Sequence, residues 1–305
     1  MDKDRFLKSC YGDKHGATLT YVNTLYDEFE ELIEGRWETL DRIPADELLL
    51  KFFELRKSYS SMSSYSTVKQ FVRSLYYYLY QHNLISGDTV LQLSKVSVSD
   101  FFTQDRIESN YFKNLEDILA HIQHSRRMLH CDKDSLIALE AAVVFLWHRF
   151  TVDEIITVKA NDCRNGIIRS STTNIQLTQI EKDIIDRYIS ASKYDGFPSG
   201  KKPVILAPSE YLFRGIHGQM NKEKFMYLFK HYNLVAKQCN FKPIKMFKIY
   251  DCRDMCDVKE LTEQGVKLID AVKQVTGLSD KSRVSKFTTT FKAWYNTFYG
   301  KEVDV

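Results

Sequence analysis

The chain has 305 residues, of which 44% are hydrophobic and 27% are charged, and its formal net charge is +3. This composition is typical of a globular protein of about two domains. With only 12 Gly and 5 Pro, it excludes a turn-rich all-β fold and a long disordered linker. Residues 1–105 hold 12 Lys and Arg against 16 Asp and Glu, whereas residues 196–300 hold 18 against 9. The basic region fits a polyanionic partner, and the alternative is an ordinary solvated surface.

The six cysteines are scattered without the spacing of a disulfide framework, which indicates cytosolic thiols. Cys252 and Cys256 would share a helix face, but a metal would need two further ligands. We therefore interpret them as buried thiols and expect no metal and no cofactor. The N-terminus lacks the apolar stretch of a signal peptide, and the longest apolar run, AAVVFLW at 141–147, is too short to span a bilayer. We expect a cytoplasmic protein without a membrane partner.

Three amphipathic helices are predicted in the N-terminal region from the spacing of apolar residues. The first covers residues 17–35, the second begins at Pro44, and the third covers 67–83 after a polar loop at 60–66. The expected core of the second helix is Leu48, Leu49, Phe52, Phe53 and Leu55. The expected core of the third is Val68, Phe71, Val72, Leu75, Tyr78 and Leu79.

The remaining chain begins with a polar stretch at 104–113, which we interpret as a hinge between two domains. A strongly apolar segment at 135–149 predicts a buried helix. Two short strands are expected around a polar turn within 165–177, and a turn at Gly215 and Gly218 precedes a helix from about Asn221. Further helices are predicted at 115–128, 151–158 and 180–190.

Residues 247–287 contain the most informative pattern. They predict a helix that carries Arg253, a turn at Gly265, a helix over 268–275, a break at Gly277, and a basic segment that ends at Phe287. This order resembles the catalytic domain of the tyrosine recombinases (the phage integrase family), in which His-x-x-Arg, Leu-Gly-His and a nucleophilic Tyr follow one another. The segment LIALEAAVVFLWHRFTVDEIITVKANDC is also similar to the family's L-L-L-Y-x-T-G-L-R-I-S-E-L-x-x-L-x-W-x-D-I.

The N-terminal segment STVKQFVRSLYYYLYQHNLI resembles the core-binding domain of the same family. The resemblance implies a mainly α, tyrosine-recombinase-like fold. It places a helical, SAM-like core-binding domain at 1–105 and a mostly helical catalytic-like domain with a small β-sheet at 106–305.

The same resemblance implies that catalysis has been lost. Thr151 stands at the family's first Arg, Tyr250 at its His, Leu278 at its second His, and Phe287 at its nucleophile. Phe has no hydroxyl to bond to phosphorus, and each missing charge-stabilising donor costs a factor of about 10²–10³ in rate. Arg149 precedes Thr151 by two residues, about 200° around a continuous helix, so it is not assumed to reach the same point.

Two alternatives stay open at this stage. Tyr295 and Tyr299 could be displaced nucleophiles, but with Trp294 they have the spacing of a helix core, which we favour. Arg253, at the family's second Arg, could contact a DNA phosphate, which we favour, or pair with a carboxylate of its own helix. The candidate carboxylates are Asp251, Asp254 and Asp257.

If catalysis has been lost, DNA binding is the function that we expect to remain. The helix that begins near Asn221 resembles the family's groove-entering helix, and the alternative for its lysines is a solvated face. The predicted DNA contacts are Lys69, Arg73, Lys222, Lys224, Lys230, Arg253, Lys281, Arg283 and Lys286.

We therefore expect a sequence-specific, double-stranded DNA-binding transcriptional repressor that occupies operator sites in the bacterial cytoplasm and maintains prophage lysogeny. The alternatives are an active or trans-complemented recombinase and an accessory DNA-binding partner of one. Further candidate partners are a regulatory protein and a second copy of the chain, bound through the tail at 288–305.

Overall fold

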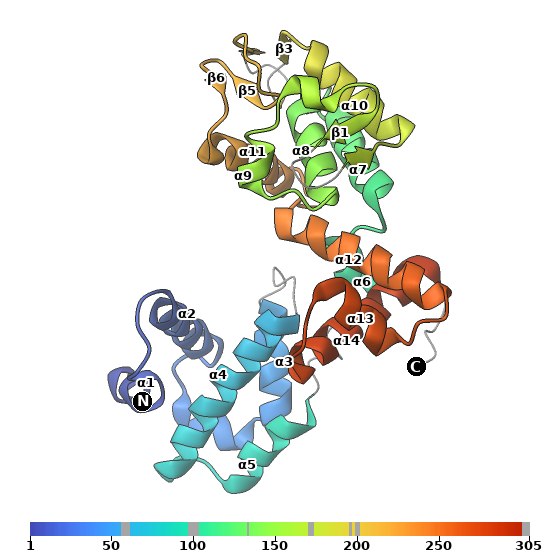
Figure 1. Cartoon of the computed structure of the whole chain (residues 1–305). Helices are drawn as coiled ribbons and strands as arrows, with labels where there is room; N and C mark the ends of the chain where they lie inside the picture. Colours follow the sequence, from blue (N-terminus) through green and yellow to red (C-terminus); the bar gives the residue numbers. More distant parts are fainter. Residues whose placement is uncertain are drawn as a thin grey trace. The chain divides into compact units, whose positions relative to one another are not determined.

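The structure is a computed structural model that describes residues 1–55, 62–96, 104–132, 134–169, 174–194, 197–198 and 202–300 (Figure 1). It is mainly helical, as predicted, and its described strands form three separate two-stranded antiparallel pairs. Within these ranges no helix has both the length and the apolar character needed to cross a bilayer. The chain divides into two compact units, Met1–Ile107 with Lys281–Ala293 and Glu108–Asp280 with Trp294–Val305.

Unit 1 is helical. Its elements are α1 (Lys3–Tyr11), α2 (Ala17–Leu32), the 3₁₀ helix η1 (Trp37–Arg42), α3 (Ala45–Leu55), α4 (Met62–Gln81), α5 (Gly87–Gln92), the 3₁₀ helix η2 (Leu93–Lys95) and the first part of α6 (Gln104–Asn110). The first part of α14 (Lys281–Tyr299) also belongs to it. The short helix α1 was not predicted, and only Phe6 and Leu7 of it are buried.

Aromatic rings form much of the core of unit 1. Phe29 meets Phe52 edge to face with ring centroids 5.3 Å apart, a geometry that aromatic pairs prefer. The predicted core stripe of α4 is confirmed, because all six of its residues are buried. Two predictions are wrong. Leu55, the last residue of α3, is 63% exposed. Helix α4 begins at Met62, inside the predicted loop at 60–66. Tyr65 in its first turn packs on Phe53 of α3, with ring centroids 5.1 Å apart.

Unit 2 combines helices with the three strand pairs. Its elements are α7 (Leu115–Met128), α8 (Ile137–Trp147), α9 (Val152–Ile155), η4 (Ala160–Cys163), β1 (Ile167–Arg169), β2 (Asn174–Gln176), α10 (Gln179–Ser190), β3 (Lys193–Tyr194), β4 (Val204–Ile205), β5 (Arg214–Gly215), β6 (Gly218–Gln219), α11 (Lys222–Gln238), α12 (Met246–Glu263), α13 (Leu268–Thr276) and the end of α14. Ile168 pairs with Ile175 between β1 and β2. The turn between these two strands and most of the predicted loop at 195–202 lie outside the described residues.

Helix α8 is the centre of unit 2, and α7, α10, α11 and α12 all pack on it. Every residue of α8 is buried, as predicted. Its one ionisable residue, Glu140, is paired on both oxygens, with Arg126 at 3.4 Å and with Arg187 at 2.6 Å. Burial raises the pKa of Glu140, and the two guanidinium groups oppose that shift. A buried carboxylate is tolerated here because two arginines face it.

The boundary between the two units falls within the predicted hinge at 104–113, after Ile107. The stretch is not polar throughout, since Tyr111 and Phe112 are buried. The carbonyl of Phe112 accepts hydrogen bonds from the thiol of Cys252 at 3.1 Å and from the indole of Trp294 at 2.9 Å. The end of α14 is therefore fixed within unit 2, to which it belongs. Cys252 is buried and Cys256 half-buried, and all six cysteines are free thiols.

Candidate nucleic-acid interface

The chain leaves α8 through a left-handed residue. The amide of Arg149 donates to the carbonyl of Leu146 at 3.0 Å. The next amide, of Phe150, donates to the carbonyl of Phe145 at 3.2 Å. These two bonds are the Schellman ending of a helix, whose first residue beyond the cap has positive φ and is usually glycine. Here that residue is Arg149, with φ 65°. Its side chain therefore starts from backbone that is no longer helical.

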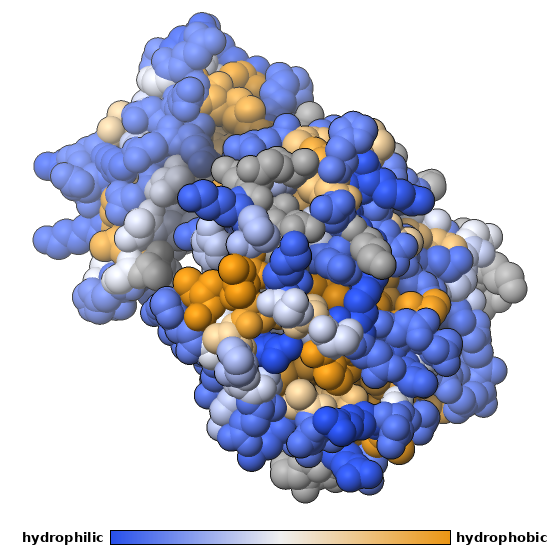
Figure 2. Space-filling view, turned by 90° about the horizontal axis from the view of Figure 1, so that it is seen from above, coloured by the Kyte–Doolittle hydropathy of each residue, from blue (hydrophilic) through white to orange (hydrophobic). Residues whose placement is uncertain are grey.

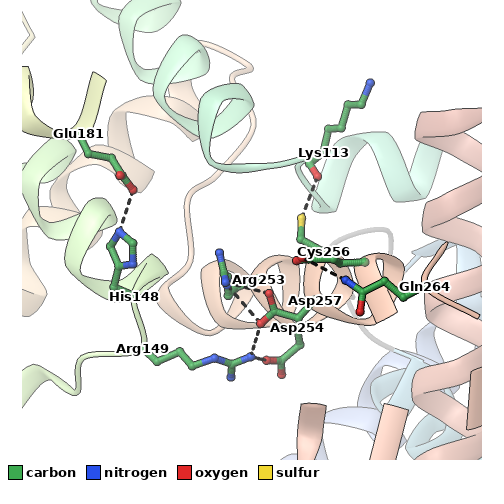
Figure 3. Close-up of polar contacts among 10 residues, drawn as sticks. Lys113, His148, Arg149, Glu181, Arg253, Asp254, Cys256, Asp257 and Gln264 are labelled. Carbon is green, nitrogen blue, oxygen red and sulfur yellow. Dashed lines mark hydrogen bonds and ion pairs between the residues drawn. The ribbon is translucent and has the colours of Figure 1, made fainter. Parts of the chain in front are cut away.

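Arg149 and Arg253 converge on two carboxylates of α12 (Figure 3). Nη2 of Arg149 lies 2.6 Å from Oδ1 of Asp254 and 2.9 Å from Oδ2 of Asp257. Nη2 of Arg253 lies 2.9 Å from Oδ1 of Asp257, one helical turn along α12. The guanidinium of Arg253 also lies over the ring of Trp147, 5.4 Å from its centroid. Asp257 thus joins the two arginines, and we call these four charged residues the Arg–Asp cluster.

The Arg–Asp cluster is balanced in charge, with two arginines against two aspartates. Burial raises the pKa of Asp254, and the neighbouring guanidinium of Arg149 opposes that rise. Burial would lower the pKa of Arg149, but its bonds to the two carboxylates outweigh it and the pKa is raised. The side chains of Arg149 and Arg253 are 45% and 34% exposed, so solvent screens these ion pairs in part.

Of the two roles left open for Arg253, the structure contains the ion pair with a carboxylate of its own helix. The 200° argument for Arg149 assumed a continuous helix, and the left-handed ending of α8 removes that assumption. The alignment that the resemblance suggests contained a signal for this, since it sets Arg149 at the glycine of the pattern T-G-L-R. The sequence alone identifies Asp254 and Asp257 as neighbours of Arg253 on one helix. It does not predict their contact with Arg149.

The four positions that the resemblance aligns with catalytic residues take part in local structure. The hydroxyl of Thr151 caps α9 and forms a capping box with Glu154. The hydroxyl of Tyr250 donates to the carbonyl of Phe150 at 2.9 Å, and burial raises its pKa. Leu278 and Phe287 are half-buried. Each of the two hydroxyls is thus engaged by neighbouring protein groups.

The C-terminal tyrosines lie in an apolar and cationic setting. Tyr299 packs on Trp294 at 5.4 Å and stacks on Tyr295 at 5.2 Å. The amines of Lys113 and Lys259 lie 4.7 Å and 5.0 Å from the centroid of the Tyr299 ring. Burial, helped by the nearby cysteines, raises the pKa of Tyr299 to about 12. A nucleophile is activated by the opposite shift. The core-packing interpretation is confirmed for Trp294, which is fully buried.

Sequence reasoning missed a hydrogen-bonded pair formed by half-buried His148, the residue before Arg149, and buried Glu181 (Figure 3). Nε2 of His148 lies 2.8 Å from Oε1 of Glu181, which is 3% exposed. Although burial works the other way, hydrogen bonds from His148 and from the N-cap residue Thr178 lower the pKa of Glu181. The pair joins the end of α8 to the start of α10.

The predicted DNA contacts of unit 2 lie at two places. Lys222, Lys224 and Lys230 are exposed on α11, and the amine of Lys222 is held 3.0 Å from a carboxylate oxygen of Asp153. Arg253 belongs to the Arg–Asp cluster instead. Among the described residues no group of three or more His, Cys, Asp or Glu is arranged to hold a metal ion.

The other five predicted contacts belong to unit 1. Lys69 of α4 is half-buried, and its amine donates to the carbonyl of Val96. Arg73, one turn further along α4, is exposed. On α14, Lys281 and Arg283 are exposed and Lys286 is half-buried. Lys69 thus holds the chain after α5, which makes it a weaker candidate for a phosphate contact than Arg73.

The surface of the molecule is mixed in character. On the face that Figure 2 presents, apolar side chains gather in patches within a hydrophilic surface.

Comparison with protein-family models and with curated proteins finds no match for this chain.

Proposed function

We propose that this protein is a catalytically inactive, sequence-specific double-stranded DNA-binding repressor, built on a tyrosine-recombinase-like scaffold, that maintains prophage lysogeny. In this role it resembles the master repressor of the SPβ-like Bacillus prophages. Repression follows from occupancy, because a protein bound across a promoter excludes the polymerase. The proposal needs a surface that attracts DNA and the loss of strand transfer.

The observation that carries the DNA-binding part is the charge of residues 211–250. This stretch holds eight Lys and Arg and a single acidic residue, Glu223. It contains α11, whose Lys224 and Lys230 are exposed. Such a concentration of one sign attracts a polyanion, and contacts with DNA phosphates supply most of the affinity of such proteins.

The Arg–Asp cluster supports the loss of catalysis. A transferring phosphate needs donors that are free to meet its developing charge. Here donors of Arg149 and Arg253 face carboxylates, and a phosphate at Arg253 would compete with Asp257 for the guanidinium. Phe287 carries no nucleophile, and the raised pKa of Tyr299 opposes attack from that side chain.

Selection of bound fragments from the host and prophage genome tests the proposal. Recovery of one repeated element near many promoters is the expected result, and each copy should give a footprint that covers promoter sequence. Recovery of a single attachment site would instead identify an accessory factor of recombination, and recovery of no preferred sequence would refute sequence-specific binding.

A nicked duplex that contains the selected element tests for strand transfer, because a nick traps the covalent intermediate. We expect no covalent adduct between protein and DNA. An adduct that disappears in Tyr295→Phe or in Tyr299→Phe would establish a recombinase with a displaced nucleophile and would overturn the proposal.

The salt dependence of binding tests the basic contacts one at a time. The slope of log K against log[salt] changes by about 0.9 for each phosphate contact, so Lys230→Ala should flatten it by about one. The matched control is Lys51→Ala, an exposed lysine paired with Glu47 on α3 and outside the predicted interface. Equal slopes for the wild type and Lys230→Ala would remove Lys230 from the interface.

A further inference from the structure

The outward face of α11 exposes large apolar side chains. Met226, Tyr227 and Leu234 are 41%, 55% and 53% exposed. Tyr227 is stacked on His231 with ring centroids 5.5 Å apart and an interplanar angle of 16°. A surface position normally carries a polar residue, so three such side chains on one face require an explanation.

The helix itself shows that this face is not turned toward the core. At 100° per residue, Met226 and Leu234 lie on one side of α11, with Lys230 between them. The opposite side carries Phe225 and Tyr232, which are both fully buried. The exposed side is therefore a second face, in which Lys230 lies between the apolar side chains of Met226 and Leu234.

The charge around this face selects its partner. Lys224, Lys230 and Lys237 are exposed along α11, and Glu223 is the only acidic residue between 211 and 250. A duplex is complementary to such a face, because the major groove admits an α-helix between two rows of phosphates. The groove also offers one apolar group, the C5-methyl of thymine, which apolar side chains contact.

We propose that α11 reads thymine C5-methyl groups in the major groove through Met226 and Leu234, while Lys230 and Lys237 contact phosphates. The inference rests on the proposed function and adds to it the bases that are read. The two side chains are eight residues apart, about 12 Å along the helix axis. At 3.4 Å per base pair, the two thymines lie about three to four base pairs apart.

The test uses a duplex recovered with the wild-type protein from a random-sequence library. Each thymine of that duplex is replaced in turn by deoxyuridine, which removes only the C5-methyl. A contacted methyl should cost about fourfold in affinity, the equivalent of one buried apolar carbon. We expect two such positions, with the spacing given above.

The protein variants assign each methyl to a side chain. Met226→Ala should abolish the deoxyuridine penalty at one position, and Leu234→Ala should abolish it at the other. Both residues are exposed, so the variants should unfold in urea as the wild type does. The matched control is Ile180→Ala on α10, which is 51% exposed and should keep both penalties.

The outcomes separate this inference from the proposed function. If the library yields no enriched duplex, sequence-specific binding fails and the inference fails with it. If a duplex is enriched but deoxyuridine is neutral at every position, the proposed function stands and thymine reading is refuted. Unchanged DNA affinity in Met226→Ala and Leu234→Ala would likewise refute it and would assign the apolar face to a protein partner.

Discussion

Arg149 offers a test in which backbone strain and ion pairing oppose each other. The residue has φ 65°, and a side chain with a Cβ costs about 1–2 kcal/mol in this left-handed region relative to glycine. The same side chain makes two ion pairs with Asp254 and Asp257. The guanidinium is 45% exposed, so each pair contributes about 0.2–1 kcal/mol after screening by solvent.

Two substitutions separate these terms. Arg149→Ala removes both ion pairs and keeps the strain, so it should lower the free energy of unfolding by about 0.4–2 kcal/mol. Arg149→Gly removes the ion pairs and also relieves the strain, so it should be about 1 kcal/mol more stable than Arg149→Ala. Urea unfolding followed by far-UV circular dichroism measures both differences.

A double-mutant cycle provides the control. Arg149→Ala and Asp254→Asn, separately and together, should give a coupling energy of about 1 kcal/mol, because the two side chains are in contact. High salt should reduce the coupling. The reasoning would be refuted if Arg149→Gly were no more stable than Arg149→Ala, or if Arg149→Ala were as stable as the wild type.

Three further changes test the interior. Glu140→Leu should cost about 3–5 kcal/mol of unfolding free energy, because buried Arg126 and half-buried Arg187 would both lose the Glu140 carboxylate. Replacing those arginines by methionine as well should restore most of the loss in urea unfolding. For Glu181 the folded pKa lies below its ordinary value of 4.5, so its contribution is present above pH 4.5 and is lost as the pH falls through the folded pKa. Stability measured against pH should therefore fall less steeply in acid for Glu181→Gln than for the wild type, and parallel curves would contradict the assigned pair. Trp294→Ala should lower the free energy of unfolding by about 3–5 kcal/mol. It should not change the sedimentation coefficient of the native protein, since Trp294 packs within its own chain. Dissociation of an oligomer in this variant would contradict the assignment.

Local pattern was sufficient for much of the helical framework. The helices at 115–128 and 135–149 were predicted within two residues of α7 and of α8, because apolar spacing and capping residues act over a few residues. The start of α11 at Asn221 was equally local, since its side chain accepts from the amide of Lys224. By contrast, α1 has only two buried residues and was missed for lack of a periodic signal.

The sequence by itself determined that the chain is mainly helical and that its positive charge gathers in the C-terminal half. The absence of a nucleophile from the stretch that resembles a recombinase active site stays a prediction. These properties depend on residue type and on short-range spacing. Only the tertiary structure decided which groups meet. Arg149 reaches carboxylates 105 and 108 positions away because α8 ends in a left-handed residue beside α12. The amine of Lys69 is engaged because the chain after α5 brings the carbonyl of Val96 to it. Such contacts depend on how distant segments pack, and no periodicity in the sequence encodes that distance.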